Sequence, residues 1–540
     1  MADIFQLANH VVVWLGVEKD DSSYALQLLS HLGSQVKVDW VGYTMKPAGG
    51  GDIDPNWADR TVSLPWAERE FRALHFLLCR SWFGRLWIRQ EILLANNDAL
   101  LKCGKQFLPW QVFRRAVFVL ERKPYPSAFC SPNLTGFLRR LDMIFYELCR
   151  TRYGWIEPIL AETRDCECED PRDRIFGILS LIIDEDQSRF RITPDYTRSV
   201  REVYQDVTMQ LMKYRNLLDI LAYCYLPSRI CGMPSWIPNW SAKPSANTLR
   251  SSLSAGGIDV HSHVQHATHN VIAVTGVMVG LVEGAWQTMF SSTKDDGYDT
   301  ITEILRLAYG VTTDCGDIIE GSSVLDAFCR TLVCDVFRDR YSPQRMQHPS
   351  FKQCRDMLYR WFTTNRYSDE DFDRGTSQGY ATRKYLDNVC WYSARRSVIR
   401  TGEAQIGLAP DIAEPGDIIV VLLGCHLPIV LRPTVSSRFE IVGECYMDGC
   451  MYGEALFGSF PNNYGAVAAL VNNGGTQLVY RKGPDGALEV TDPRLPPPDP
   501  GTFHDDGIVR YWLNENGSDP RISVETLTER GVKLEEFELI

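Results

Sequence analysis

The chain has 540 residues, enough for about three or four domains of ordinary size, so a single hydrophobic core cannot hold it. Hydrophobic residues make up 45% of the chain and charged residues 23%, values that are typical of globular proteins and exclude a wholly disordered or fibrous chain. The formal net charge of −12 repels a phosphate backbone, so we expect no nucleic-acid partner.

The cysteines and the apolar stretches bear on the compartment. The 16 cysteines are scattered and form no Cys-x-x-Cys pair, a pattern typical of reduced thiols in a cytosolic protein. The first residues lack the basic start and long apolar stretch of a signal peptide. The most apolar run, from Ile418 to Leu431, is shorter than the ~20 residues that a membrane-spanning helix needs. We therefore expect a cytoplasmic protein with no membrane span, and no pattern in the sequence requires a metal or another cofactor.

Apolar spacing predicts alternating strands and helices in the first part of the chain. The continuous run from Val11 to Leu15 is typical of a strand buried on both faces of a parallel sheet. Helical spacing follows over residues 24–32, 65–78 and 86–95. This order favours the α/β fold class.

A helix start stands out further along the chain. Asp170 is a candidate N-cap and Pro171 fits the first helical position. The three charged residues that follow, Arg172, Asp173 and Arg174, are expected to be solvated on the first turn. A second helical pattern runs over residues 200–214, so this part of the chain is predicted to be mostly helical.

The pattern changes beyond residue 245. Residues 301–307 and 351–362 are predicted helices among extended segments. From residue 397 to residue 460, short apolar runs separated by Gly and Pro predict a small barrel or meander. The rest of the chain contains a hairpin signal, a Pro-rich linker and a polar tail.

Two patterns resemble functional sites only weakly. The Gly-x-Ser-x-Gly string at residues 375–379 follows a polar run, whereas a nucleophile elbow requires an apolar strand there, so we interpret the string as a chance match. A histidine cluster has no acidic or cysteine ligand interleaved, and we favour an exposed polar loop over a metal site; its members are His261, His263, His266 and His269.

Glu91 is the strongest candidate for a functional carboxylate. On a helix over residues 86–95, Glu91 shares one face with three apolar residues, Trp87, Leu94 and Ala95. A carboxylate in an apolar stripe requires compensation, and such groups gather at functional sites. The alternative, which the sequence alone favours, is a structural ion pair with Arg172 or Arg174.

Several blocks of the sequence resemble the fungal heterokaryon incompatibility (HET) domain proteins. The resemblance runs from the first residues to about Leu456, and its blocks include ANHVVVWLG at 8–16, WFGRLWIRQEILLA at 82–95, CEDPRDRIFGILSL at 168–181, PSWIPNW at 234–240 and TGEAQIGLAPDIAEPGDIIVVLLG at 401–424. It implies a role in non-self recognition and associated programmed cell death, exerted through contacts with other intracellular proteins, self-association included. Family members usually carry a further strand and turn ahead of these blocks, so the chain is expected to be truncated at its N-terminus relative to the family.

HET domains in turn resemble TIR domains, some of which cleave NAD. A strand followed by a helix with Trp four residues before Glu is matched here by VVVWLG and by Trp87 and Glu91. The resemblance therefore implies an alternative function, a TIR-like NAD glycohydrolase in which Glu91 is the catalytic carboxylate and NAD is the substrate. It assigns no residue to nucleotide binding, because the pocket-forming strands of those enzymes correspond to the segment that is missing here. Whether the chain is an enzyme stays open.

These observations predict five regions. They are an incomplete TIR-like parallel sheet with flanking helices over residues 1–115, a helical extension of the HET region over 116–245, a mixed α+β region over 246–396, a small all-β module over 397–460, and a hairpin, Pro-rich linker and C-terminal tail over 461–540. The all-β module has a further possible role, as a peptide-binding barrel that presents Arg432 and Tyr446, although a packing module is favoured.

Overall fold

A computed structural model describes most of the chain. The residues outside the description are 1, 41, 50–53, 125–131, 151–153, 244–245, 247–248, 250–252, 258–259, 269, 288–293, 311–321, 346–347, 365, 374–375, 471–475, 484–485, 499–502, 506–509 and 513–518. The chain divides into two compact units, Met1–Val203 and Tyr204–Ile540.

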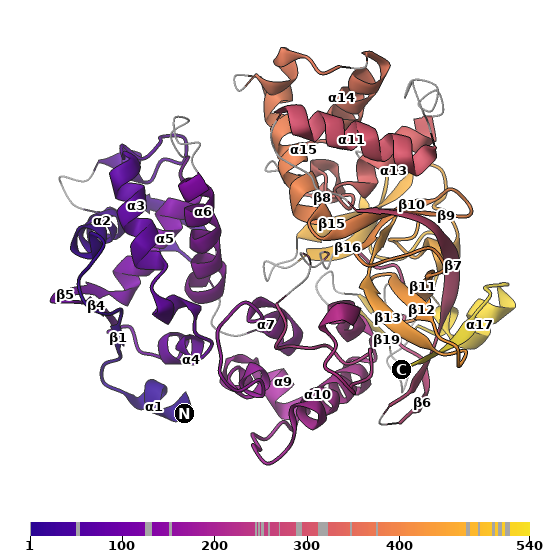
Figure 1. Cartoon of the computed structure of the whole chain (residues 1–540), viewed down its shortest axis with the longest axis horizontal. Helices are drawn as coiled ribbons and strands as arrows, with labels where there is room; N and C mark the ends of the chain where they lie inside the picture. Colours follow the sequence, from indigo (N-terminus) through magenta and orange to yellow (C-terminus); the bar gives the residue numbers. More distant parts are fainter. Residues whose placement is uncertain are drawn as a thin grey trace. The chain divides into compact units, whose positions relative to one another are not determined.

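The first unit alternates helices and short strands (Figure 1). Its elements are α1 (Ala2–Leu7), β1 (Val12–Trp14), α2 (Ser22–Ser34), β2 (Val36–Asp39), β3 (Thr44–Pro47), α3 (Glu68–Leu78), α4 (Ile88–Leu93), β4 (Leu100–Cys103), β5 (Gln106–Pro109), α5 (Trp110–Arg122), α6 (Pro132–Ile144), α7 (Ile156–Glu162), α8 (Asp173–Phe176) and α9 (Asp184–Arg189). Helix α10 (Val200–Arg215) crosses the boundary between the units.

The core of the first unit is built on helix α5. Apolar residues at positions i, i+3, i+4 and i+7 of this helix are fully buried, namely Phe113, Ala116, Val117 and Leu120. Helix α2 packs against α5 at Gly33, where a Cβ atom would lie 2.1 Å from the carbonyl oxygen of Val112. Only glycine therefore permits this helix–helix approach.

The sheet of the first unit has the strand order β1-β4-β5. Strand β1 pairs parallel with β4, and β4 pairs antiparallel with β5. The predicted strand is present, but the prediction that both its faces are buried is wrong. Val13 is 2% exposed, whereas Val12 and Trp14 are each 51% exposed, because only one face of β1 packs on the core. The TIR-like topology of the sheet stays a prediction.

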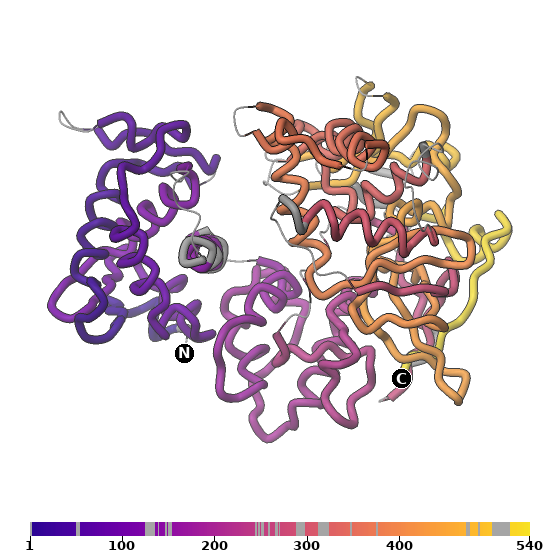
Figure 2. Tube along the Cα trace, turned by 45° about the horizontal axis from the view of Figure 1, so that its top comes forward, coloured from indigo at the N-terminus to yellow at the C-terminus, as the bar shows by residue number. Residues whose placement is uncertain are grey.

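The second unit contains most of the strands. Its long helices are the coils in the red and orange part of the trace in Figure 2. Its helices are α11 (Lys294–Tyr309), α13 (Ser322–Thr331), α14 (Phe351–Thr364), α15 (Ser377–Ser393), α16 (Glu454–Phe457) and α17 (Val524–Glu529). Its strands are β6 (Val264–Ala267), β7 (Ile272–Gln287), β8 (Tyr341–Ser342), β9 (Arg396–Thr401), β10 (Ile406–Pro410), β11 (Ile418–Leu422), β12 (Ile429–Pro433), β13 (Phe439–Glu444), β14 (Tyr446–Met447), β15 (Tyr464–Leu470), β16 (Thr476–Lys482), β17 (Leu488–Glu489), β18 (Phe503–Asp505), β19 (Arg510–Trp512) and β20 (Glu535–Leu539).

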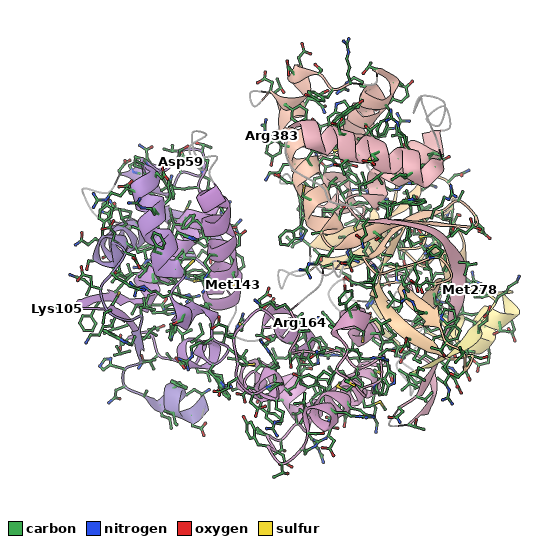
Figure 3. The ribbon with its side chains drawn as sticks, in the orientation of Figure 1. Asp59, Lys105, Met143, Arg164, Met278 and Arg383 are labelled. Atoms are coloured by element: carbon green, nitrogen blue, oxygen red, sulfur yellow. The ribbon has the colours of Figure 1, made fainter. Side chains whose placement is uncertain are left out.

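A closed β-barrel forms the centre of the second unit. The pairing order β7-β11-β12-β13-β20 returns to β7, and β9, β10 and β14 extend the same sheet from the second half of β7. Every residue of β10 and β11 is buried, as closure requires of strands covered on both faces. On the outside of the barrel, Met278 of β7 is 40% exposed (Figure 3).

The barrel uses strands from three distant parts of the chain. The predicted strands within residues 397–460 are present, and β7 and β20 join them from far upstream and downstream. Strand β20 pairs antiparallel with β7, and Leu539 of β20 lies opposite Phe439 of β13 in a parallel pairing. The last residues of the chain thus complete the barrel. The mixed helix and strand content that the sequence predicts is confirmed.

A smaller sheet has the order β17-β16-β15-β8. The predicted hairpin signal at residues 483–488 lies between β16 and β17, which pair antiparallel. Strand β8 joins this sheet by parallel pairing of Tyr341 with Ala468 of β15. In the part of the chain that the structure describes, no helix is long and apolar enough to cross a membrane.

Candidate functional site

The two strongest sequence blocks of the first unit meet in space. The block around helix α4 and the block around helix α8 are joined at Glu167, whose backbone N–H donates to Gly84 O at 2.6 Å and whose carbonyl accepts from Leu86 N at 2.9 Å. Gln90 Nε2 on α4 also donates to Gly177 O at 2.7 Å. Segments about eighty residues apart in sequence therefore support one another.

Asp173 is the central acceptor of this junction. Its Oδ2 accepts from Trp87 Nε1 at 3.1 Å, and its Oδ1 accepts from the Tyr196 hydroxyl at 2.6 Å. Burial and the hydrogen bond to Asp173 raise the pKa of Tyr196 to about 12, so its hydroxyl stays protonated and able to donate. One carboxylate thus links three segments of the chain.

The expectation that the charges of this block are solvated is wrong. Arg172 forms an ion pair with Asp170 at 2.7 Å and donates to the carbonyl oxygens of Tyr196 at 2.6 Å and Arg198 at 2.8 Å. Arg174 is 7% exposed and donates to Thr163 O at 2.6 Å. Helix α8 begins at Asp173, later than the predicted start at Pro171. Asp170 Oδ1 nevertheless accepts from Arg172 N at 2.9 Å, the bond that an N-cap residue makes.

Glu91 lies on helix α4 in a half-buried position. Its Oε2 accepts a hydrogen bond from Trp82 Nε1 at 3.3 Å, and it makes no ion pair with any residue that the structure describes. The predicted ion pair with Arg172 or Arg174 is therefore wrong, because both guanidinium groups bind elsewhere. The catalytic assignment of Glu91 remains a prediction.

The face of α4 that enters the core also differs from the prediction. Ile88 is 1% and Ile92 is 2% exposed, whereas Trp87 and Glu91 are only half-buried. The helical period was predicted correctly, but the buried face carries Ile88 and Ile92, one residue on from the predicted Trp87 and Glu91.

The weaker motifs fall on ordinary structural positions. Thr376 of the Gly-x-Ser-x-Gly string caps helix α15 by accepting from Gly379 N at 2.9 Å, and Gly375 lies outside the described residues. His263 Nδ1 lies 2.9 Å from Thr275 Oγ1, and His269 is outside the described residues. Within the described ranges, no group of three or more His, Cys, Asp or Glu side chains is placed to hold a metal ion.

The barrel residues proposed to face a peptide do not do so. Tyr446 is 1% exposed, because β14 pairs with β10 inside the second unit. Arg432 donates to both carboxylate oxygens of Asp417, at 2.8 and 3.0 Å, and to Ile412 O at 2.8 Å. The peptide-binding interpretation of these two residues is wrong, since both are used within the barrel.

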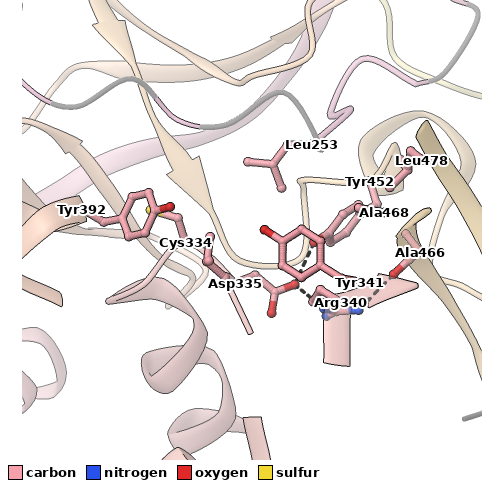
Figure 4. Close-up of a pocket in the computed structure, with 11 residues that line it drawn as sticks. Leu253, Cys334, Asp335, Arg340, Tyr341, Tyr392, Tyr452, Ala466, Ala468 and Leu478 are labelled. Atoms are coloured by element: carbon pink, nitrogen blue, oxygen red, sulfur yellow. Dashed lines mark hydrogen bonds and ion pairs between the residues drawn. The ribbon is translucent and has the colours of Figure 1, made fainter. Parts of the chain in front are cut away.

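A pocket in the second unit has the polar groups that a binding site needs (Figure 4). Asp335 is its buried acid: Arg340 Nε lies 2.6 Å from Asp335 Oδ2, and the Tyr452 hydroxyl donates to the same oxygen at 2.8 Å. The pocket is small, with room for about one water molecule. The remaining lining residues are Leu253, Cys334, Val336, Tyr341, Tyr392, Ala466, Ala468 and Leu478.

The backbone at Asp335 is strained. Cys334 and Asp335 follow the end of helix α13 with φ of 50° and 58°, in the left-handed region that non-glycine residues rarely adopt. Each such residue costs about 1–3 kcal/mol, and strain of this kind concentrates at functional sites. Burial raises the pKa of the Asp335 carboxyl, an effect that Arg340 and Arg330 oppose. Strain, burial and charge thus coincide in one pocket.

Sequence reasoning missed this pocket. The available signal was Asp335 itself, a single acid inside the apolar run from Leu332 to Phe337. Its partners come from separate places, Arg340 from the next turn and Tyr452 from more than a hundred residues downstream. Only the fold brings them together.

Comparison with known proteins agrees with the barrel. A family described as "Het-6 beta-barrel domain" matches residues 371–457, which contain β9 to β14. "Heterokaryon incompatibility protein 6, OR allele" of Neurospora crassa is 23% identical over 547 residues, which cover 84% of this chain and 78% of that protein. No solved structure matches the chain.

Proposed function

We propose that the chain is a fungal heterokaryon incompatibility (HET) protein that acts in non-self recognition in the cytoplasm, by contacts with other proteins that lead to programmed cell death. The observation that carries the proposal is the likeness to the Neurospora protein, which extends over 84% of the chain and so reaches into both units. A shared barrel alone would support a common fold but would say little about a common role.

The geometry of the first unit supports action by contact. Polar side chains of the blocks around α4 and α8 form hydrogen bonds with one another. Trp87 and Tyr196, for example, both donate to Asp173. These hydrogen bonds hold the two blocks in one conformation, and the polar groups that form them are not left available for a reaction. The exposed side chains of Val12 and Trp14 give strand β1 an apolar outer face.

The alternative, NAD cleavage with Glu91 as the catalytic carboxylate, gains no support from the comparisons. It remains a prediction that the same experiment can address. The contact proposal requires the folded junction at Asp173, whereas the enzyme alternative requires the carboxylate of Glu91.

The test is expression of the full chain in one of two fungal strains that otherwise fuse compatibly. We expect the wild-type chain to lower heterokaryon recovery at least tenfold. Glu91→Gln keeps the size of the side chain and is expected to leave that effect within about twofold, and NAD content in the fused cells is expected to be equal for both.

The matched variant is Asp173→Ala, which removes the acceptor of Trp87 and Tyr196 and is expected to abolish the effect. Protein levels are compared on blots so that loss of protein is not mistaken for loss of recognition. Normal heterokaryon recovery with the wild-type chain would contradict the proposal. A loss with Glu91→Gln accompanied by restored NAD content would instead favour the enzyme alternative.

A further inference from the structure

Helix α15 of the second unit, labelled in Figure 1, has one buried face and one exposed face. The buried side chains belong to a hydrophobic core shared with helices α13 and α14, namely Tyr385, Leu386, Val389 and Tyr392. The exposed face carries two large aromatic side chains, Tyr380 at 42% and Trp391 at 54% exposure. Tyr and Trp are enriched where proteins contact one another, so this face is a candidate interaction surface.

Four residues of the exposed face form a single line along the helix, here called the α15 stripe. They are spaced by four, three and four positions: Tyr380, Lys384, Asp387 and Trp391. Because a helix advances by about 100° per residue, the four side chains lie within about 60° of one another around the helix axis. This spacing is that of the a and d positions in a coiled coil. The α15 stripe therefore has the pattern of a surface that packs against another helix.

The α15 stripe is complementary to itself. When two copies of α15 run antiparallel about a twofold axis between Tyr385 and Leu386, Tyr380 of each copy lies opposite Trp391 of the other. Lys384 lies opposite Asp387 in the same arrangement, because both pairs of positions are centred on the same point of the helix. A twofold axis requires a self-complementary surface of this kind.

The charged residues favour an antiparallel second copy over other arrangements. Within one chain Lys384 Nζ lies 4.0 Å from Asp387 Oδ2, the long limit of an ion pair, and the two side chains are 44% and 57% exposed. Both charges are therefore accessible to a group of opposite charge on another molecule. An antiparallel copy places an opposite charge against each of them, whereas a parallel copy would place Lys384 against Lys384 and Asp387 against Asp387.

We propose that the α15 stripe is a self-association surface, through which two copies of the chain pair by antiparallel contact of their α15 helices. The aromatic pairs lie at the two ends of a contact about 16 Å long, and the ion pairs lie between them. Four half-exposed side chains per copy bury less than the ~1,200 Å² of a standard interface, so we expect a reversible dimer with a Kd of about 10–100 μM. This inference does not depend on the proposed function.

The test is sedimentation velocity of the full chain at about 1–200 μM, with reversals of the two charges. Lys384→Glu places an acid against Asp387 of the second copy, and Asp387→Lys places a cation against Lys384. Each variant alone is expected to dimerise at least tenfold more weakly than the wild-type chain. The double variant restores both opposite-charge pairs and is expected to dimerise within about threefold of the wild-type affinity.

A mixture of the two single variants tests the antiparallel register. When Lys384→Glu pairs with Asp387→Lys, each acid again lies opposite a cation. We therefore expect the equimolar mixture to form a dimer at concentrations where neither variant does so alone. A mixture that stays monomeric while the wild-type chain dimerises would overturn the proposal.

The aromatic pairs are tested by Trp391→Ala, which is expected to weaken dimerisation at least tenfold. The matched control is Tyr359→Ala on helix α14, an aromatic residue of similar exposure, 45%, that lies outside the α15 stripe. This control is expected to change the affinity less than twofold. Thermal unfolding of each variant reports whether the fold is kept.

A measurement on the wild-type chain covers the case in which a variant fails to fold. Hydroxyl-radical oxidation, mapped by mass spectrometry, is expected to slow at Tyr380 and Trp391 as the concentration rises, while Tyr359 is oxidised at the same rate. A wild-type chain that stays monomeric at about 200 μM would overturn the proposal. Equal losses of affinity in Trp391→Ala and Tyr359→Ala, or unchanged oxidation of Tyr380 and Trp391, would also overturn it.

Discussion

Strand β1 of the first unit and strand β11 of the second are both short apolar runs rich in β-branched residues, yet one is half exposed and the other is buried. Val12 and Trp14 of β1 are each 51% exposed, and β1 pairs only with β4 among the described strands. Strand β11 is buried throughout and pairs with both β7 and β12. The same local pattern is compatible with an open edge or a barrel wall, and the number of neighbouring strands decides which one forms.

The sheet that contains the barrel also buries a pair of opposite charges. Arg396 of β9 and Glu444 of β13 form an ion pair at 2.6 Å, with side chains 2% and 9% exposed. Arg396 Nη1 further donates to Glu444 O at 3.2 Å. If the comparison is right, the closed barrel responds to substitutions far more strongly than the open sheet.

The largest effect is expected from Arg396→Leu. This change leaves the Glu444 carboxylate buried without its cation, which costs about 3–5 kcal/mol in the free energy of unfolding. Native-state hydrogen exchange of the β11 amides measures that free energy for the barrel. The control is Arg229→Gln, which removes a more exposed pair with Glu440 and should cost less than about 1 kcal/mol. Equal costs for the two variants would contradict the expectation.

The contribution of β20 is tested by Phe537→Ala. Phe537 is 2% exposed, and its ring lies 5.5 Å from that of Phe439 on β13. Its truncation is expected to destabilise the barrel by about 3 kcal/mol in the same exchange experiment. Glu535→Ala changes an exposed residue of the same strand and should stay within about 0.5 kcal/mol. A cost for Phe537→Ala as small as this would show that β20 does not complete the barrel.

The open sheet is tested by two neighbouring valines of β1. Val13→Ala removes a buried side chain and is expected to cost about 2 kcal/mol, whereas Val12→Ala should cost less than about 0.5 kcal/mol because Val12 is half exposed. Exchange of the β4 amides measures both. Similar costs for the two valines would mean that a partner covers the outer face of the strand.

The smallest effect concerns pH. The hydrogen bond from the Tyr24 hydroxyl lowers the pKa of Glu70 below its ordinary value of 4.5, an effect that burial opposes and the Ala67 N–H supports. The stability gained is therefore present above pH 4.5 and is lost as the pH falls below it. We expect this pH dependence, a measurable loss of stability of up to about 1 kcal/mol between about pH 5 and 3, to disappear in Glu70→Gln without a change in the barrel. An unchanged pH profile of the first unit would argue against it.

Periodicity and turn residues predicted much of the fold. Helices α2, α3, α10, α11 and α14 and the strands of the 397–460 module are found where apolar spacing placed them. Those signals are local, because the apolar residues of a helix or a strand repeat with the period of that element alone. Burial, in contrast, depends on neighbours, and the predictions for β1, for Tyr446 and for the face of α4 were wrong for that reason.

Less of the candidate site than of the fold could be predicted from the sequence. Glu91 was found because it interrupts an apolar helix face, but its partner is Trp82 and neither of the expected arginines. Asp335 and Arg340 were missed because their environment is assembled from α13, β8 and the β15–β16 hairpin. No spacing rule relates residues that only the fold brings together.

The most direct test of the comparison between the two sheets is hydrogen exchange across the full wild-type chain. If residues 535–539 complete the barrel, their amides exchange as slowly as those of β11, while the amides of Val12 and Trp14 on β1 exchange at least a hundredfold faster. Fast exchange at residues 535–539 together with slow exchange at β11 would show a barrel that closes without β20, and would contradict the structure of the second unit proposed here.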